Sequence, residues 1–250
     1  MNSYLFQGIP VDIPDSLQEI QSCIEELLSA SDASTLSFIN PEIFMEARHN
    51  EELLNYLNQT KYNFADGIGL IKAINHYEKG NYTVKNRFPG TDFFEYLSDD
   101  SVVRVFLFGA HEENNKLATY RIETSGNNVK VVGRLNGFTD LDDDEIVKTI
   151  NQSQPDILIV CLGCPKQELW INKHKKELDC RIVFGNGGGI DFWSGAKKRA
   201  PAFFIHHGLE WVYRLFQDFT CFRIRRQMRL IPFFLRSLAD NWEIKAYERE

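Results

Sequence analysis

The stretch ILIVCLGCPKQELWINKHKKELDCRIVFGNGGG, residues 157–189, contains the pattern that decides the fold. Residues 157–162 form an uninterrupted apolar run, residues 166–176 have the composition of a helix, and residues 181–184 form a second apolar run before a glycine cluster. Apolar runs joined by a helix are typical of parallel strands that are covered on both faces. The stretch therefore predicts a strand, a crossover helix and a neighbouring parallel strand.

The same alternation extends toward the N-terminus. Strands are expected at 35–39, 63–65, 102–108 and 129–132, and helices at 17–28, 51–57, 68–77, from beyond 109 to about 122, and 142–150, with a further short helix capped by Thr91 or Asp92. We predict an α/β fold with a Rossmann-like parallel sheet and helices on both faces over residues 1–200. A helical, arginine-rich, membrane-proximal appendage is expected over residues 201–250, and its removal is expected to leave the fold intact.

Length and composition exclude several classes of protein. The 250 residues include 43% hydrophobic and 25% charged residues, which is the usage of a globular protein and not of a disordered or collagen-like chain. The longest apolar run, residues 157–164, is far shorter than the roughly 20 residues of a membrane-spanning helix. The N-terminus has no secretory pattern, and five cysteines without a framework spacing suit a reducing cytosol.

The charge is unevenly distributed along the chain. Residues 219–239 hold five arginines and no acidic residue, although the whole chain carries a net charge of −7. Such a basic segment on an acidic protein indicates an anionic partner: phosphate, anionic lipid or nucleic acid. Its apolar residues share one helical face, and Pro232 is expected to divide the helix. An interfacial helix and an ordinary surface helix with a solvated basic face both fit this pattern.

Turns that carry chemically useful residues follow six of the expected strands. Glycine lets a ligand approach the backbone, and a helix that starts there offers free N–H groups to phosphate, although turns need glycine without any ligand as well. Six such turns along one edge of a sheet favour a binding site. Their candidate ligand-binding residues are Asn40, Gly109, Ala110, Asn136, Gly137, Gly163, Gln167, Asn186, Gly187, Gly188 and Asp191.

Two carboxylates in these turns have alternative interpretations. Asp66 lies between an expected strand and a Gly-x-Gly turn, where it is placed either to act as a general base or to cap the helix that starts at Ile68. Asp191 follows the glycine cluster and is placed either to bind ribose hydroxyls or to cap a helix.

The spacing of Cys161-Leu-Gly-Cys164 is that of a redox or metal motif. No second cysteine pair accompanies it, Cys161 lies inside an apolar run, and a structural zinc site needs four ligands. We therefore expect no metal and no cofactor.

Several short motifs resemble those of one known family. The matching residues are Asn40-Pro41-Glu42, Tyr62 to Gly67, Arg87, Gly90-Thr91-Asp92, Gly163, Pro165 to Glu168, Gly187-Gly188, Asp191-Phe192, Ser194-Gly195, Lys198 to Pro201, Gly208 to Trp211 and Tyr213-Arg214-Leu215. In this order and density they resemble the WecG/TagA/CpsF family of bacterial glycosyltransferases, from about residue 35 to residue 238. One departure is Phe38, where many members carry threonine, which indicates a different donor sugar.

The resemblance implies an activity and a set of site residues. It implies inverting, metal-independent transfer of a sugar, such as an N-acetylhexosamine, from a UDP-sugar to a polyprenyl-diphosphate-linked saccharide in cell-surface polysaccharide biosynthesis. The enzyme would be peripheral on the inner face of the cell membrane. Asp66 would be the base, Arg87 and Gln167 would line the pocket, and Arg214, Arg223 and Arg226 would be catalytic arginines of the appendage.

Two other functions fit the sequence less well. A dinucleotide-dependent oxidoreductase would carry Gly-x-Gly-x-x-Gly after its first strand, whereas residues 185–190 match that pattern poorly and lie late in the chain. A nucleic-acid-binding protein would use the arginine segment, but the rest of the chain is acidic and lacks base-stacking motifs, so we expect no nucleic-acid partner. An apolar patch beneath the appendage would favour a homo-oligomer.

Overall fold

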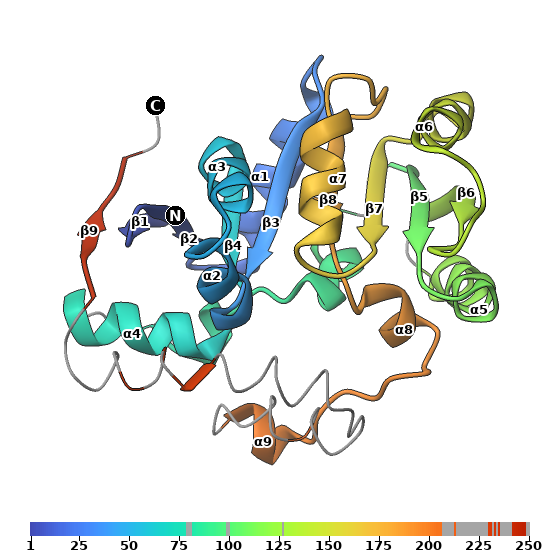
Figure 1. Ribbon diagram of the computed structural model, residues 1–250. Coiled ribbons are helices and arrows are strands. Elements are labelled where there is room, and N and C mark those ends of the chain that lie inside the picture. The colour runs from blue at the N-terminus through green and yellow to red at the C-terminus, as the bar shows by residue number, and fades with distance from the viewer. Residues whose placement is uncertain are drawn as a thin grey trace.

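A single mixed sheet organises the computed structural model (Figure 1), which describes residues 1–78, 82–98, 101–126, 128–206, 213, 230, 231, 233, 235 and 242–248. Within these residues the strand order is β6-β5-β7-β8-β3-β4-β2-β1-β9. The strands are β1 (Asn2–Phe6), β2 (Ile9–Ile13), β3 (Ser34–Ile39), β4 (Tyr62–Ala65), β5 (Val103–Gly109), β6 (Val129–Leu135), β7 (Ile157–Cys161), β8 (Ile182–Gly185) and β9 (Ile244–Ala246).

The strands from β6 to β2 are parallel, and only β1 and β9 join the sheet antiparallel. The direction of the chain through the sheet reverses between β5 and β7. From β5 the chain moves to β6 on one side, and from β7 it moves to β8 on the other. In open parallel sheets such a reversal leaves a crevice at the carboxyl ends of the two strands, where ligands bind. In Figure 1 these ends point toward the side on which helices α8 and α9 lie.

Helices cover both faces of the sheet. One face carries α1 (Leu17–Ser29), the 3₁₀ helix η2 (Gly90–Tyr96), α5 (Glu112–Thr124) and α8 (Gly189–Trp193), which share one apolar cluster. The other face carries α2 (Pro41–Ala47), α3 (Glu51–Gln59), α4 (Ile68–Glu78), α6 (Asp143–Gln152) and α7 (Lys166–His174). The structure also describes the 3₁₀ helix η1 (Val84–Asn86) and α9 (Ala202–His206).

The strand β5 shows why this layered arrangement forms. Phe106 and Phe108 are buried in the cluster on one face, whereas Val103, Val105 and Leu107 are buried in the cluster on the other. Successive side chains of a strand point to opposite faces, so a continuous apolar run needs cover on both sides. The predicted α/β class, with a Rossmann-like sheet and helices on both faces, is confirmed.

The helices and strands predicted over residues 17–184 form, with ends shifted by one to three residues, whereas the helix expected to be divided at Pro232 lies largely outside the described residues. Local caps explain several starts: Ser16 accepts from the amide of Glu19 at α1, and Asp142 forms a capping box with Glu145 at α6. The short helix expected near residues 91–92 forms as the 3₁₀ helix η2, but neither Thr91 nor Asp92 caps it: it starts after Pro89, which has no polar side chain. The Asp92 carboxylate pairs with Arg199.

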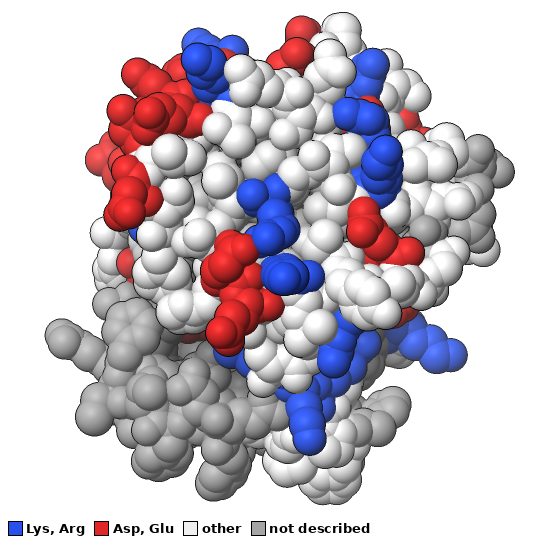
Figure 2. Space-filling view, turned by 90° about the vertical axis from the view of Figure 1, so that its right-hand side faces the viewer, with Lys and Arg blue, Asp and Glu red and all other residues white. Residues whose placement is uncertain are grey.

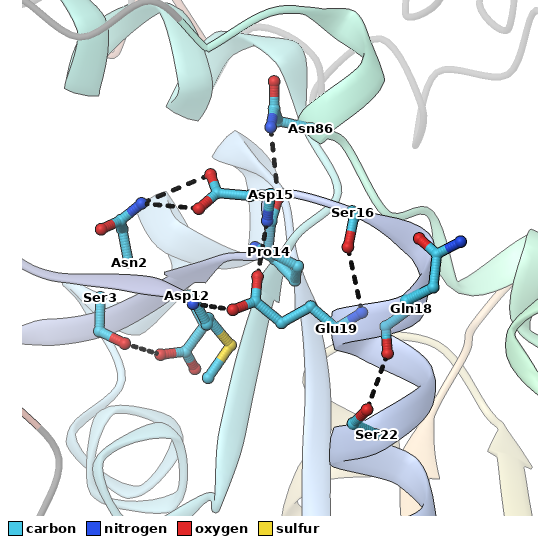
Figure 3. A network of polar contacts seen from close by, with 11 residues as sticks. Asn2, Ser3, Asp12, Pro14, Asp15, Ser16, Gln18, Glu19, Ser22 and Asn86 are labelled. Carbon is cyan, nitrogen blue, oxygen red and sulfur yellow. Dashed lines mark hydrogen bonds and ion pairs between the residues drawn. The ribbon is translucent and has the colours of Figure 1, made fainter.

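The N-terminal hairpin of β1 and β2 was not predicted from the sequence. Its turn, Gln7-Gly8, has φ of 51° and 81° at the two positions, the left-handed values that a two-residue hairpin favours. The buried Asp12 of β2 accepts from the hydroxyl of Ser3 and from the amide of Asn63, at 2.7 Å each, so the hairpin is held to β4 by a carboxylate. Figure 3 shows Asp12 and Ser3, together with Asn86, whose amide group donates to the carbonyl of Pro14.

The C-terminal end of the described chain returns to the main sheet. Strand β9 pairs with β1, and Phe233 and Trp242 are buried among the rings of Phe6 and Phe44. The expectation that residues beyond 200 can be removed without loss of the fold was therefore wrong, since some of them belong to the core. The domain boundary at residues 200 and 201 stays a prediction.

A search of the described residues for a helix both long and apolar enough to cross a bilayer finds none.

Candidate functional site

The turns at the chain reversal pack directly against each other. Gly109 ends β5 with φ of +135°, and a Cβ there would lie 2.3 Å from the carbonyl oxygen of Cys161. Ala110 also has a positive φ, of 57°, and its carbonyl accepts from the amide of Gly137 at 2.8 Å. The candidates Gly109, Ala110 and Gly137 thus meet in one place. Gly109 is buried there against the backbone of Cys161, whereas Ala110 and Gly137 are partly exposed at the edge where parallel sheets bind ligands.

Gln167 holds the neighbouring turn after β7. Its Oε1 accepts from the amide of Gly163 at 3.0 Å, and its Nε2 donates to Oε1 of Glu168 at 2.8 Å. The side chain is only 2% exposed. Gln167 therefore shapes the floor of the site from beneath, and the bare backbone of Gly163 and of the exposed Gly187 and Gly188 forms its surface.

The side chain of Gln167 packs against the backbone of Gly185, where any larger residue would clash with it. Gly185→Ala is therefore expected to lower the free energy of unfolding by about 1–3 kcal/mol. A Cβ at Gly185 would lie 2.5 Å from Nε2 of Gln167, whose bonds on both sides oppose a shift. The matched control is Gly188→Ala, where no atom lies within 4 Å of the added Cβ and φ is −106°. Urea denaturation measures both variants, and equal stability of the two would contradict the assigned role of Gln167.

Asn186 connects the turn after β8 to the 3₁₀ helix η2. Its Nδ2 donates to the carbonyl of Gly90 at 2.8 Å. Beneath this contact Phe38 packs against Phe64, Phe93 and Phe184 in the buried core. Phe38, which stands where many members of the family carry threonine, therefore belongs to the buried packing beneath the site.

Asp66 follows β4 at the same edge, and its side chain is 21% exposed. Its Oδ1 lies 3.7 Å from Nε of Arg87, whose own side chain is nearly buried. The amide of Phe88 donates to the carbonyl of Ala65 at 3.0 Å, so the segment that carries Arg87 crosses the end of β4. The Asp66 carboxylate is therefore partly open to solvent and lies beside a guanidinium at the carboxyl edge.

Asn40 has a local structural role. Its Oδ1 accepts from the amides of Glu42 and Ile43 at 3.0 Å each and caps α2, with Pro41 at the first helical position. The turn after β4 packs against it, since a Cβ on Gly67 would lie 2.3 Å from Cδ of Pro41. The structure therefore places Asn40 beside the Asp66 turn as a helix cap. Asn136 caps its own turn in a similar way, with Oδ1 accepting from the amide of Phe138.

Asp191 lies in the first turn of α8 and is held by two partners. Its Oδ1 accepts from Nδ2 of Asn114 at 2.9 Å, and its Oδ2 pairs with the ammonium group of Lys197. Lys198 and Arg199 follow on the exposed surface. Figure 2, which faces the β6 side of the molecule, shows basic side chains gathered in its lower part, toward the carboxyl edge, and an acidic patch at its upper left. Basic side chains therefore lie near the carboxyl edge, and two of them, Lys197 and Arg199, are paired with Asp191 and Asp92.

The thiol of Cys161 shows no sign of redox or metal chemistry. Cys161 is buried at the end of β7, and burial raises the pKa of its thiol to about 12, so the group is protonated at neutral pH. Among the described side chains no group of His, Cys, Asp and Glu is arranged to hold a metal ion.

Three predicted catalytic residues, Arg214, Arg223 and Arg226, lie outside the described residues. The structure adds residues that the sequence analysis did not select: Asn114 and Lys197, which hold Asp191, and the ring pair of His111 and Phe138 in the turns after β5 and β6. An exposed aromatic residue directly after Asn136-Gly137 was the available signal for Phe138.

A parallel sheet with glycine turns at its chain reversal and a paired carboxylate further along the same edge defines an α/β enzyme architecture that binds its ligand at the carboxyl edge. Comparison with known proteins specifies the class. The profile of the "Glycosyl transferase WecG/TagA/CpsF family" matches residues 4–247. Two relatives, from Staphylococcus aureus strains MRSA252 and MW2, are each 32% identical over 237 residues, which cover 93% of this chain and 90% of the relative. Both are named N-acetylglucosaminyldiphosphoundecaprenol N-acetyl-beta-D-mannosaminyltransferase.

The chain belongs to the WecG/TagA/CpsF glycosyltransferase family. The predicted activity, sugar transfer, is confirmed at this level, and the oxidoreductase and nucleic-acid alternatives are not supported.

Proposed function

We propose that this chain transfers an N-acetylhexosamine from a UDP-sugar to a polyprenyl-diphosphate-linked saccharide, in the synthesis of a cell-surface polysaccharide. The acceptor class is supported by the names of the relatives, which act on an N-acetylglucosaminyl-diphosphoundecaprenol. The observation that carries the proposal is the position of Asp66: a partly exposed carboxylate, paired with Arg87, at the same sheet edge as the glycine turns.

In this proposal Asp66 takes the proton from the acceptor hydroxyl as that oxygen attacks the anomeric carbon. The bond from the sugar to UDP breaks on the opposite side, so the anomeric configuration inverts. The leaving diphosphate needs positive charge, which Arg214, Arg223 and Arg226 would supply by bidentate hydrogen bonds. No metal ion is required for this step.

The location follows from the acceptor. A polyprenyl chain lies in the membrane, so the enzyme would act at the cytoplasmic membrane surface, with the arginines of residues 219–239 near anionic headgroups. The helical appendage, self-association and peripheral binding to the inner face of the membrane are parts of this proposal.

An assay of UDP release tests the proposed function directly. The protein is incubated with a panel of UDP-sugars and a short-chain polyprenyl-diphosphate N-acetylglucosamine. We expect release of UDP with one N-acetylhexosamine donor, dependent on the lipid-linked acceptor and insensitive to a chelator such as EDTA. The absence of acceptor-dependent release with every donor would contradict the proposal, and loss of activity with EDTA would contradict its metal-independent step.

A further inference from the structure

Two aromatic rings stack at the carboxyl edge, next to the chain reversal. The centroids of the His111 and Phe138 rings are 4.4 Å apart, and their planes are inclined by 17°. His111 is the N-cap residue of α5, two positions beyond the end of β5, and Phe138 lies three positions beyond β6. The hydrogen bond from the amide of Gly137 to the carbonyl of Ala110 joins the two turns and fixes one ring against the other.

Phe138 is 68% exposed, although one face of its ring rests on the imidazole. A single exposed apolar side chain is common on protein surfaces and by itself indicates nothing. Here the ring is supported by a second ring and lies where a parallel sheet binds its ligand. Its outer face is therefore a flat apolar surface, held in place and open to solvent.

We propose that the stacked pair of His111 and Phe138 binds the nucleobase of the donor nucleotide. This inference rests on the proposed function, in which the donor is a UDP-sugar. Bases bind to aromatic side chains by stacking, because both present flat π faces. A base on Phe138 would have the partly exposed turn residues Ala110 and Gly137 at its side, where a ribose and phosphate can approach the backbone.

The strand order also indicates how the donor would lie along the carboxyl edge of the sheet. Neighbouring strands lie about 4.8 Å apart, so β5 and β4, four steps apart in the sheet, are separated by about 19 Å. The turns after β7 and β8, with open space beside Gly163 and Gly188, lie between them. An elongated ligand would thus place its base on Phe138, its diphosphate over the glycine turns and its sugar toward Asp66.

Calorimetric titration with UDP tests the inference. Phe138→Ala is expected to weaken UDP binding roughly 5- to 150-fold, the usual effect of removing one ring that stacks on a base. Phe138→Trp should restore binding to within a few-fold of the unchanged protein. The matched control is Tyr120→Ala, an equally exposed aromatic residue on α5, which should bind UDP as the unchanged protein does.

Titration with pyrophosphate, which has no base, distinguishes the loss of base stacking from a general disturbance of the site by the substitution. Its affinity is expected to be the same in the unchanged protein and in Phe138→Ala. Equal UDP affinity of these two proteins would overturn the inference, and so would an equal loss for UDP and pyrophosphate. If the unchanged protein binds UDP no more tightly than pyrophosphate, the uridine adds no affinity and the proposed base-binding role of Phe138 is wrong. If it binds no UDP at all, the proposed function fails as well.

Discussion

Replacing Asp66 by asparagine is expected to lower the turnover number for sugar transfer by roughly 10²–10⁴-fold, the usual contribution of a positioned general base. Asparagine has nearly the same size but cannot accept the proton of the acceptor hydroxyl. UDP affinity should change little, because the base and the diphosphate are proposed to bind over β5, β7 and β8, away from β4. The measurement is turnover in the UDP-release assay, together with calorimetric affinity for UDP.

The matched control is Asp140→Asn, an exposed carboxylate in the turn region after β6. It should retain full turnover. Thermal melts of both variants show whether either change affects folding. Turnover of Asp66→Asn within a few-fold of the unchanged enzyme would demote Asp66 to a structural partner of Arg87, and the mechanism proposed above would have to name another base.

Replacing Trp242 by alanine is expected to lower the free energy of unfolding by about 3–5 kcal/mol, the range for removing a large aromatic side chain from a core. Trp242 is 4% exposed and contacts Phe6, Phe44 and Phe233, with ring centroids 5.2 to 5.5 Å apart. The guanidinium of Arg48 also lies over its ring, 5.5 Å from the centroid. Urea denaturation followed by circular dichroism gives the value.

Leu235→Ala serves as the control, because Leu235 is 61% exposed and should change stability by no more than about 0.5 kcal/mol. A loss below about 1 kcal/mol for Trp242→Ala would mean that the C-terminal end of the chain does not belong to the core. The expected loss has a practical consequence: a truncation after residue 200 would test stability and activity together, so point substitutions of Arg214, Arg223 and Arg226 are the better test of the appendage.

Much of the fold could be predicted from local patterns. The runs at 157–161 and 105–108 are apolar at successive positions, which is typical of strands covered on both faces and predicts a parallel α/β sheet. The hairpin of β1 and β2 was missed because its strands are short and the second contains Pro10 and the buried charge of Asp12. The Asp12 carboxylate is tolerated there because Ser3, nine residues away, and Asn63, 51 residues away, donate to it.

The site shows the same division. Sequence alone indicated that glycine turns and Asp66 lie at one edge, since the carboxyl ends of parallel strands share an edge wherever each strand is placed. The sequence could not distinguish residues that bind the substrate from residues that hold the turns in place. Asn40 and Gln167 form hydrogen bonds to protein groups near them in the chain, and only the tertiary structure shows these bonds.

By itself, then, the sequence determined the sheet, its layers and the family, because apolar periodicity, glycine turns and short motifs are properties of neighbouring residues. The tertiary structure alone decided that Arg87 meets Asp66, that Phe138 rests on His111 and that Trp242 closes the core against Phe6. Each of these contacts joins segments that become neighbours only through the order of the strands in the sheet. That order depends on how the two faces of the sheet pack against the helices, which no local sequence pattern encodes.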